Sequence, residues 1–189
     1  MSTPLRAEAL AVLAAATQAA NGAPDVERAL GHLTAATREV LGDKEAPLRP
    51  GGLRAGECPF MVSGIFLIAA DCQHHLLMAE HGVPPAQHRL RISLDLSHMG
   101  WVVQHQRPLV LANTDEAPEF RQILQTSRMG SALLGPMFWR GQMLGQLITA
   151  AQARNIYGPI DLDLLMCFPH AAAAVYMAHG EPEWLEALG

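Results

Sequence analysis

Two apolar runs, residues 131–139 and 143–148, are separated by the short polar connection Arg140-Gly141-Gln142. Both runs are rich in residues that favour β-strands, and Gly141 can adopt the positive φ angle that a tight turn often needs. This pattern predicts a β-hairpin. We expect its two strands to form the centre of a sheet, with the rest of the chain arranged around them.

The residues before the hairpin predict small helices that cover this sheet. Residues 95–103 begin with a helix-capping residue and continue as a short amphipathic helix. Residues 107–112 are typical of a short strand, and a second helical pattern surrounds Phe120. This arrangement leaves a cavity between the helices and the sheet, and that cavity is the candidate functional site.

The remaining segments predict an α+β protein. The expected elements are helices at 5–20 and 25–41 and strands at 60–70, 75–81 and 88–94. A last helix begins near Pro159 and contains Pro169, which should kink it because proline cannot donate a backbone hydrogen bond. Strands joined by tight turns imply an antiparallel sheet, with helices from both chain ends on one face and the middle helices on the other.

Composition narrows the class of protein. Hydrophobic residues make up 50% of the chain and charged residues 16%, which permits a sizeable core and excludes general disorder. The net charge of −5 and a single lysine, Lys44, give no attraction for nucleic acid. No apolar run approaches the roughly 20 residues that cross a membrane, and the start lacks a signal-peptide pattern, so we expect a cytoplasmic protein.

Several short motifs, in this order and spacing, resemble a GAF domain, the small-molecule sensing module of phosphodiesterases, phytochromes and many bacterial regulators. The motifs are Gly100-Trp101-Val102-Val103, Arg107-Pro108-Leu109-Val110, Phe120, the run 129–137, the run 140–145 and the spaced aspartates of 161–165. The resemblance covers residues 25–177 and implies a six-stranded antiparallel sheet, helices on both faces, and a pocket between the sheet and the middle helices.

Within this resemblance we divide the chain into three parts. Residues 1–22 form an N-terminal helix for packing or dimerisation, residues 23–180 form the GAF-like sensor domain, and residues 181–189 form a C-terminal tail. The segment 43–59 is rich in proline and glycine and is an insertion, either a lid or a surface loop.

The sequence lacks the motifs by which three types of GAF domain bind their ligands. Asn113-Thr114-Asp115-Glu116 lacks the lysine and the spacing of the cyclic-nucleotide signature. Free methionine-(R)-sulfoxide reductases cluster cysteines around the pocket, whereas Cys58, Cys72 and Cys167 are widely spaced here. The bilin-attaching cysteine of phytochromes is also missing.

The candidate ligand-binding residues come from the segment around the expected cavity. They are Asp95, Ser97, His98, Met99, Trp101, Phe120, Met129, Ser131 and Leu133. A helix start at Ser97 favours a small anion, although Asp95 or Ser97 more ordinarily caps such a helix. The apolar members are equally typical of core packing.

Two further hypotheses involve a metal or heme. Cys72, His74, His75 and His81 include metal-ligating side chains, but adjacent strand residues point to opposite faces, and we predict no metal site. His98 would be the axial ligand if the pocket held heme. The sequence identifies no cofactor.

We find no set of nucleophile, base and orienting residue, and therefore predict a protein that is not an enzyme. The favoured function is a sensor that binds a small anion or metabolite and signals to a separate protein such as a kinase or transcription regulator. A homodimer formed through the first and last helices is expected. The alternatives are a dimerisation or scaffold module with an empty pocket, and a heme-linked or redox protein.

Overall fold

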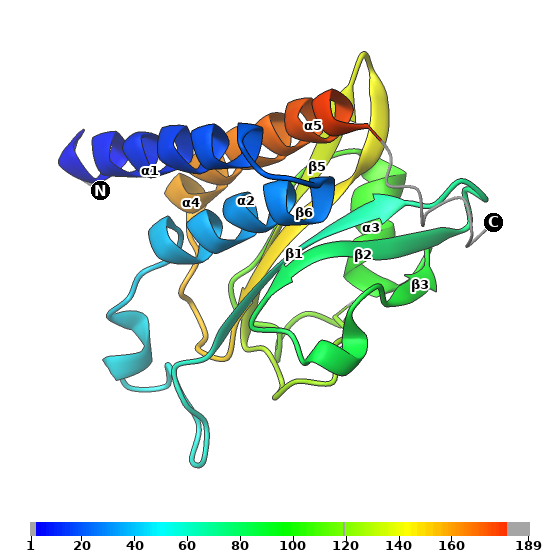
Figure 1. Ribbon diagram of the computed structural model, residues 1–189. Coiled ribbons are helices and arrows are strands. Elements are labelled where there is room, and N and C mark those ends of the chain that lie inside the picture. Colours follow the sequence, from blue (N-terminus) through cyan, green and yellow to red (C-terminus); the bar gives the residue numbers. More distant parts are fainter. Residues whose placement is uncertain (1–2, 119, 181–189) are drawn as a thin grey trace.

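A computed structural model describes residues 3–118 and 120–180 (Figure 1). Its six strands form one antiparallel sheet in the order β3-β2-β1-β6-β5-β4. The strands are β1 (Met61–Ile68), β2 (His74–His81), β3 (Arg91–Ser93), β4 (Leu109–Leu111), β5 (Ser131–Trp139) and β6 (Gln142–Ala151). The helices are α1 (Thr3–Asn21), α2 (Val26–Val40), α3 (Ser97–His105), α4 (Pro159–Leu165) and α5 (Cys167–His179), with 3-10 turns η1 (Ala46–Leu48) and η2 (Pro85–Gln87).

The predicted hairpin is confirmed as the β5–β6 pair, and it lies inside the sheet because β1 pairs with β6 and β4 with β5. Arg140 and Gly141 both have positive φ at its turn, +49° and +82°. A Cβ atom at Gly145 would lie 2.1 Å from the Phe66 carbonyl oxygen, so only glycine permits this close approach of β6 to β1.

Both faces of the sheet are covered. Figure 1 shows α1, α2, α4 and α5 on one side and α3 on the other. Side chains alternate along β5 and β6, so Leu133 and Leu147 join the core beneath α1, α2 and α5, whereas Leu134 and Ile148 join the core beneath α3. The predicted α+β class and six-stranded sheet are therefore confirmed.

The last helix is interrupted, as Pro169 predicts. α4 ends at Leu165 and α5 begins at Cys167. The proline ring is incompatible with an uninterrupted helix because it lacks an N–H and crowds the carbonyl of the residue four positions earlier. The stretch Pro159–His179 contains an 18-residue window with a mean hydropathy of 1.3, which is long and apolar enough for a membrane-crossing helix by length and composition alone; half of that window is buried inside the fold.

The segment around Phe120 and the strand expected at 88–94 differ from the sequence-based prediction. Phe120 lies in an irregular segment, not a helix, and the strand expected at 88–94 is reduced to the three residues of β3 because η2 and its turn occupy the preceding residues. The C-terminal tail, residues 181–189, lies outside the described residues. The insertion 43–59 contains η1 and turns.

Candidate functional site

The structure has a cavity where the sequence predicts one, but side chains nearly fill it. It lies between α3, the irregular segment 112–130, which we call the roof segment, and strands β1, β5 and β6. Its floor is apolar and consists of Val62, Phe66, Ala132, Leu134, Ile148 and Ala150. The volume is about 30 Å³, which is about the space of one water molecule.

A histidine and a phenylalanine stack at the edge of this cavity. The ring centroids of His98 and Phe120 are 4.9 Å apart, and the planes differ by 28°. His98 is 5% exposed, and burial lowers its pKa to about 4. Its imidazole is therefore neutral at pH 7; Nδ1 lies 3.0 Å from the Ser97 hydroxyl oxygen, which leaves Nε2 as the ring nitrogen for a further hydrogen bond. The guanidinium of Arg128 lies 5.5 Å from the Phe120 ring centroid, within cation–π range.

Side-chain hydrogen bonds hold the roof segment in place. Gln122 accepts from the Met129 amide at 3.0 Å and donates to the Leu124 carbonyl at 2.9 Å. Thr114 donates its hydroxyl to the Met129 carbonyl at 2.6 Å. Since no helix or strand occurs within the described part of 112–130, the segment can move without breaking regular secondary structure.

A buried polar pair lies beneath α3. The amide nitrogen of Gln146 donates to His75 Nε2 at 2.8 Å and lies 3.2 Å from the Met99 carbonyl oxygen. Both side chains are fully buried, and burial lowers the pKa of His75 to about 4. The pair fixes α3 to strands β2 and β6 through a neutral histidine.

Arg154 connects the roof segment to the insertion. Its side chain is 3% exposed, and its guanidinium pairs with Glu57 of the insertion and with Asp115 of the roof segment. Asp115 also pairs with Arg54 at 2.7 Å and with Arg128 at 3.1 Å. Desolvation raises the pKa of both carboxyls and is the largest single effect on Asp115. The hydrogen bonds and positive charges of Arg154 and its neighbours together outweigh it, so the pKa values of Glu57 and Asp115 lie below their usual range.

The structure divides the predicted ligand-binding residues among three places. His98, Met99, Phe120 and Met129 line the cavity. Asp95, Ser97 and Trp101 line a separate groove of about 790 Å³ on the outer side of α3. Ser131 and Leu133 point to the opposite face of the sheet, where Ser131 donates to the Ala153 carbonyl, so the expectation that they reach the cavity is wrong.

Strand alternation explains why Ser131 and Leu133 were wrongly assigned to the cavity and why Ala132 and Leu134 line it instead. Residues 131 and 133 share one face of β5, so Ala132 and Leu134 necessarily occupy the other. Arg121 and Gln122 also line the cavity, and no periodic signal in the sequence marks them. They reach it because the irregular roof segment folds back over the sheet.

The start of α3 also differs from the capping hypothesis. No side chain caps this helix: Asp95 instead accepts a hydrogen bond from the Ser93 hydroxyl, and Ser97 accepts one from the Arg121 amide at 2.9 Å. Ser97 adopts a φ of +56°, which is unusual for a residue with a side chain. The serine thereby joins α3 to the roof segment.

The histidines and cysteine considered for a metal do not converge. His75 is buried beside Gln146, whereas His74 is paired with Asp71 at 2.7 Å. Within residues 3–118 and 120–180, no three His, Cys, Asp or Glu side chains are grouped so as to hold a metal ion. Cys58 and Cys72 are exposed, and no cysteine lines the cavity.

Solved structures with the same fold include GAF domains and an enzyme, free methionine-R-sulfoxide reductase. The GAF domain of a phosphoenolpyruvate-protein phosphotransferase from Acinetobacter aligns with a TM-score of 0.71 and 19% identity, covering 100% of this chain and 98% of that chain. The corresponding Coxiella burnetii domain gives 0.71 and 22%, with 90% and 93% coverage. Free methionine-R-sulfoxide reductase from Neisseria meningitidis, in complex with its substrate, gives 0.71 and 18%, with 95% and 93% coverage. No match was found among curated proteins.

The reductase structures correct one prediction. We expected that the chain is not an enzyme, because its sequence contains no recognisable catalytic set. Free methionine-R-sulfoxide reductases have this same fold, so neither the fold nor the missing motifs exclude catalysis. At 18% identity or less, these likenesses show the fold alone.

The sequence itself matches a family model over most of its length. The model describes the GAF domain and matches residues 25–175. The match begins at Asp25, the residue that caps α2, and reaches into α5, so it includes the whole sheet and the roof segment. The chain therefore belongs to the GAF domain family.

Proposed function

We propose that this GAF domain is a regulatory module that binds a cytoplasmic small molecule between α3, the roof segment and the sheet. The observation that carries the proposal is the His98–Phe120 stack, which places a neutral imidazole and an aromatic face beside an apolar floor. Arg121 adds a positive charge at the same place. This combination suits a metabolite with an apolar body and a hydrogen-bonding or anionic group.

Binding requires the roof segment to move. Small-molecule sites usually measure about 300–1,000 Å³, far more than the present 30 Å³. A ligand that fits only the open arrangement shifts the population toward it. The displacement would alter the Arg154 ion pairs and the position of α3, and a separate protein such as a kinase or transcription regulator would detect the change.

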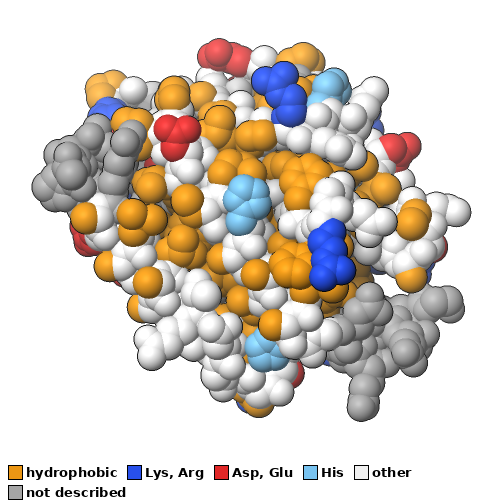
Figure 2. Space-filling model, turned by 90° about the horizontal axis from the view of Figure 1, so that it is seen from above, with side chains coloured by type: hydrophobic (Ala, Val, Ile, Leu, Met, Phe, Trp, Pro, Cys, Tyr) orange, Lys and Arg blue, Asp and Glu red, His pale blue; other side chains and the backbone are white. Residues whose placement is uncertain are grey.

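A second copy of the chain is the partner that we propose for α1 and α5. Seen from the side on which these helices lie, the surface carries many hydrophobic and few charged side chains (Figure 2). Leu10 is 53% exposed and Met177 43% exposed. The double variant Leu10→Glu/Met177→Glu should lower the fraction of dimer measured by analytical ultracentrifugation. Leu48→Glu is the control, because Leu48 is 76% exposed but lies in the insertion, and it should leave the dimer fraction unchanged. Equal effects would remove the dimer proposal.

Thermal unfolding against a metabolite panel tests the binding proposal. A ligand at about 100 times its dissociation constant stabilises the protein by about 2.7 kcal/mol. His98→Asn should abolish the response of the active metabolite. His105→Asn is the matched control, because this histidine lies on the same helix but stacks on Trp101 outside the cavity. The proposal would be refuted if no metabolite of the panel raises the melting temperature, or if His98→Asn and His105→Asn lose the response equally.

A further inference from the structure

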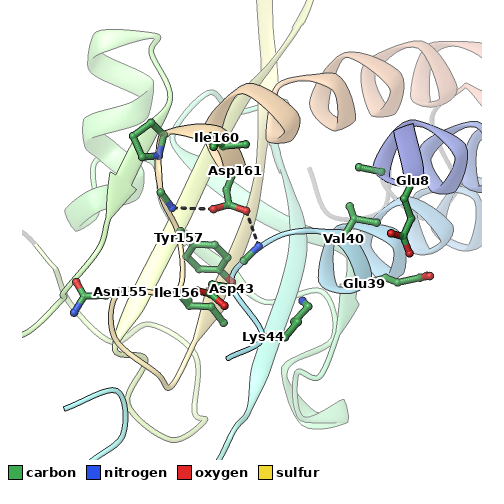
Figure 3. A pocket seen from close by; sticks show the side chains of 14 residues that line it. Glu8, Glu39, Val40, Asp43, Lys44, Asn155, Ile156, Tyr157, Ile160 and Asp161 are labelled. Carbon is green, nitrogen blue, oxygen red and sulfur yellow. Dashed lines mark hydrogen bonds between the residues drawn. The ribbon is translucent and has the colours of Figure 1, made fainter. Parts of the chain in front are cut away.

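A second and larger cavity lies on the helical side of the sheet. It is formed by α1, the end of α2, and the connection between β6 and α4 (Figure 3). Its volume is about 640 Å³, within the usual range for small-molecule sites. It is separate from the cavity under the roof segment and shares no lining residue with it.

One wall of this cavity is apolar and fixed. Ile156 and Tyr157 form its base; both are nearly fully buried, at 2% and 3% exposed, and the Tyr157 hydroxyl lies 3.0 Å from Thr149 Oγ1 inside the core. Gly42 is pressed against this wall: a Cβ atom there would lie 2.9 Å from Ile156 Cγ1 and 3.1 Å from Tyr157 Cε1. This packing fixes the base of the cavity, and the half-buried side chains of Val40 and Ile160 supply accessible apolar surface in its lining.

Three of the charged groups that line the cavity already have partners. Asp161 accepts backbone N–H groups from Gly42 at 2.7 Å and Gly158 at 2.8 Å. Lys44 donates to the carbonyl oxygens of Arg38 and Leu41 at 2.8 and 2.7 Å. Asp43 forms an ion pair with Arg49. These groups close the end of α2 and are not available as the principal contacts of a ligand.

Glu8 and Glu39 differ from this group. Both line the cavity and are exposed, and neither has a hydrogen bond or ion-pair partner among the described residues. Figure 3 shows them coming from α1 and α2 on one side of the cavity. With Asp43 paired to Arg49, the three other carboxylates of the lining still outnumber its one ammonium group, that of Lys44, so the charge of the cavity favours a cation.

We propose that this cavity binds a small organic cation, with its ammonium or guanidinium group between Glu8 and Glu39 and its apolar body against Val40 and Ile160. The carboxylates supply charge-assisted hydrogen bonds, and the two aliphatic side chains supply apolar contact. Because the two glutamates belong to different helices, the bound cation joins α1 to α2. The site thus gives the domain a second input that does not pass through the roof segment.

The experiment uses n-hexylammonium chloride as the probe, with hexanoate and hexanol of the same chain length and sodium chloride to match ionic strength. Calorimetry measures affinity, and backbone amide shifts locate the site. We expect hexylammonium to bind best and to perturb residues 39–44 and 156–161. The Glu8→Gln/Glu39→Gln variant should bind about tenfold more weakly, since exposed ion pairs contribute a few-fold each.

Asp163→Asn is the matched control, because Asp163 is an exposed carboxylate of α4 that does not line the cavity. It removes one charge and should leave hexylammonium binding unchanged. Glu8 and Glu39 are exposed, so their replacement should not prevent folding, and far-ultraviolet circular dichroism verifies this. The proposal is overturned if hexylammonium does not bind, if hexanol binds equally well, or if the double variant binds as the wild type does.

Discussion

The Nε atom of Arg154 lies 2.9 Å from Oδ2 of Asp115, and this contact joins the residues after β6 to the roof segment. The same guanidinium pairs with Glu57 of the insertion. Three segments distant in the sequence therefore meet at one buried cation. Ion pairs to Arg154 therefore hold the insertion next to the roof segment.

Replacing Arg154 with methionine should destabilise the protein strongly. The substitution keeps an unbranched chain but leaves the carboxylates of Glu57 and Asp115, which are 14% and 17% exposed, without their buried partner. Removing one partner of a buried ion pair typically costs about 3 kcal/mol. Urea unfolding measures this loss. Arg28→Met removes an ion pair whose arginine is 73% exposed and should cost less than about 1 kcal/mol; similar losses in both variants would contradict the argument.

Replacing Gln122 with alanine should loosen the roof segment. The side chain accepts from the Met129 amide and donates to the Leu124 carbonyl, so its loss leaves both groups without that partner. We expect faster hydrogen exchange at Met129 and a loss of about 1–2 kcal/mol. Gln104→Ala, on the exposed side of α3, is the control. Unchanged exchange at Met129 would show that other contacts hold the segment.

The two buried histidines should make stability depend on pH. The pKa values of His75 and His98 are lowered to about 4 by burial, whereas a histidine in the unfolded chain titrates near 6.5. Between these values the unfolded state binds more protons, so stability falls as pH decreases from about 6.5 to 4, by about 3 kcal/mol for each histidine. Urea titrations across this range measure the slope. His98→Asn should reduce it, and an unchanged slope would count against the assignment.

A second pH effect should appear at lower pH. The pKa values of Glu57 and Asp115 are lowered in the folded protein, so their stabilising effect is present above their ordinary values, 4.5 and 3.8. It is lost as pH falls further and both carboxylates become protonated. Arg154→Met should weaken this acid-induced loss without altering the histidine step. If Arg154→Met loses stability at low pH as steeply as the wild type does, other carboxylates cause the loss.

Leu133 and Leu134 provide a matched test of the two faces of β5. Both side chains are fully buried, and truncation of either to alanine should cost about 2–5 kcal/mol. Leu134→Ala should shift the methyl resonances of Met99 and Met129, which line the cavity. Leu133→Ala should instead shift those of Met78 and Met137, which lie in the other core. The reverse pattern would mean that the faces are misassigned.

Local patterns in the sequence determined much of the fold. The apolar runs around Gly141 predicted the central hairpin, and Pro169 predicted the interruption between α4 and α5. These features depend on residues close together in the chain, where alternation, turn chemistry and the missing N–H of proline act directly. Helical spacing did not separate Trp101 from His98, because residues three positions apart share a helix face; only the packing of α3 places Trp101 on the outer groove.

Tertiary structure alone decided which residues form the site. Alternation shows that Ser131 and Leu133 share a face of β5, but only the packing of α1, α2 and α5 decides that this face is not the one beneath α3. Arg154 meets Glu57 across 97 residues, and the Gln125 amide meets Gln87 across 38 residues. Such contacts depend on the three-dimensional path of segments that have no repeating pattern, so neighbouring residues carry no signal for them. The small size of the cavity beneath the roof segment and the ion pairs to the insertion therefore became visible only in the folded chain.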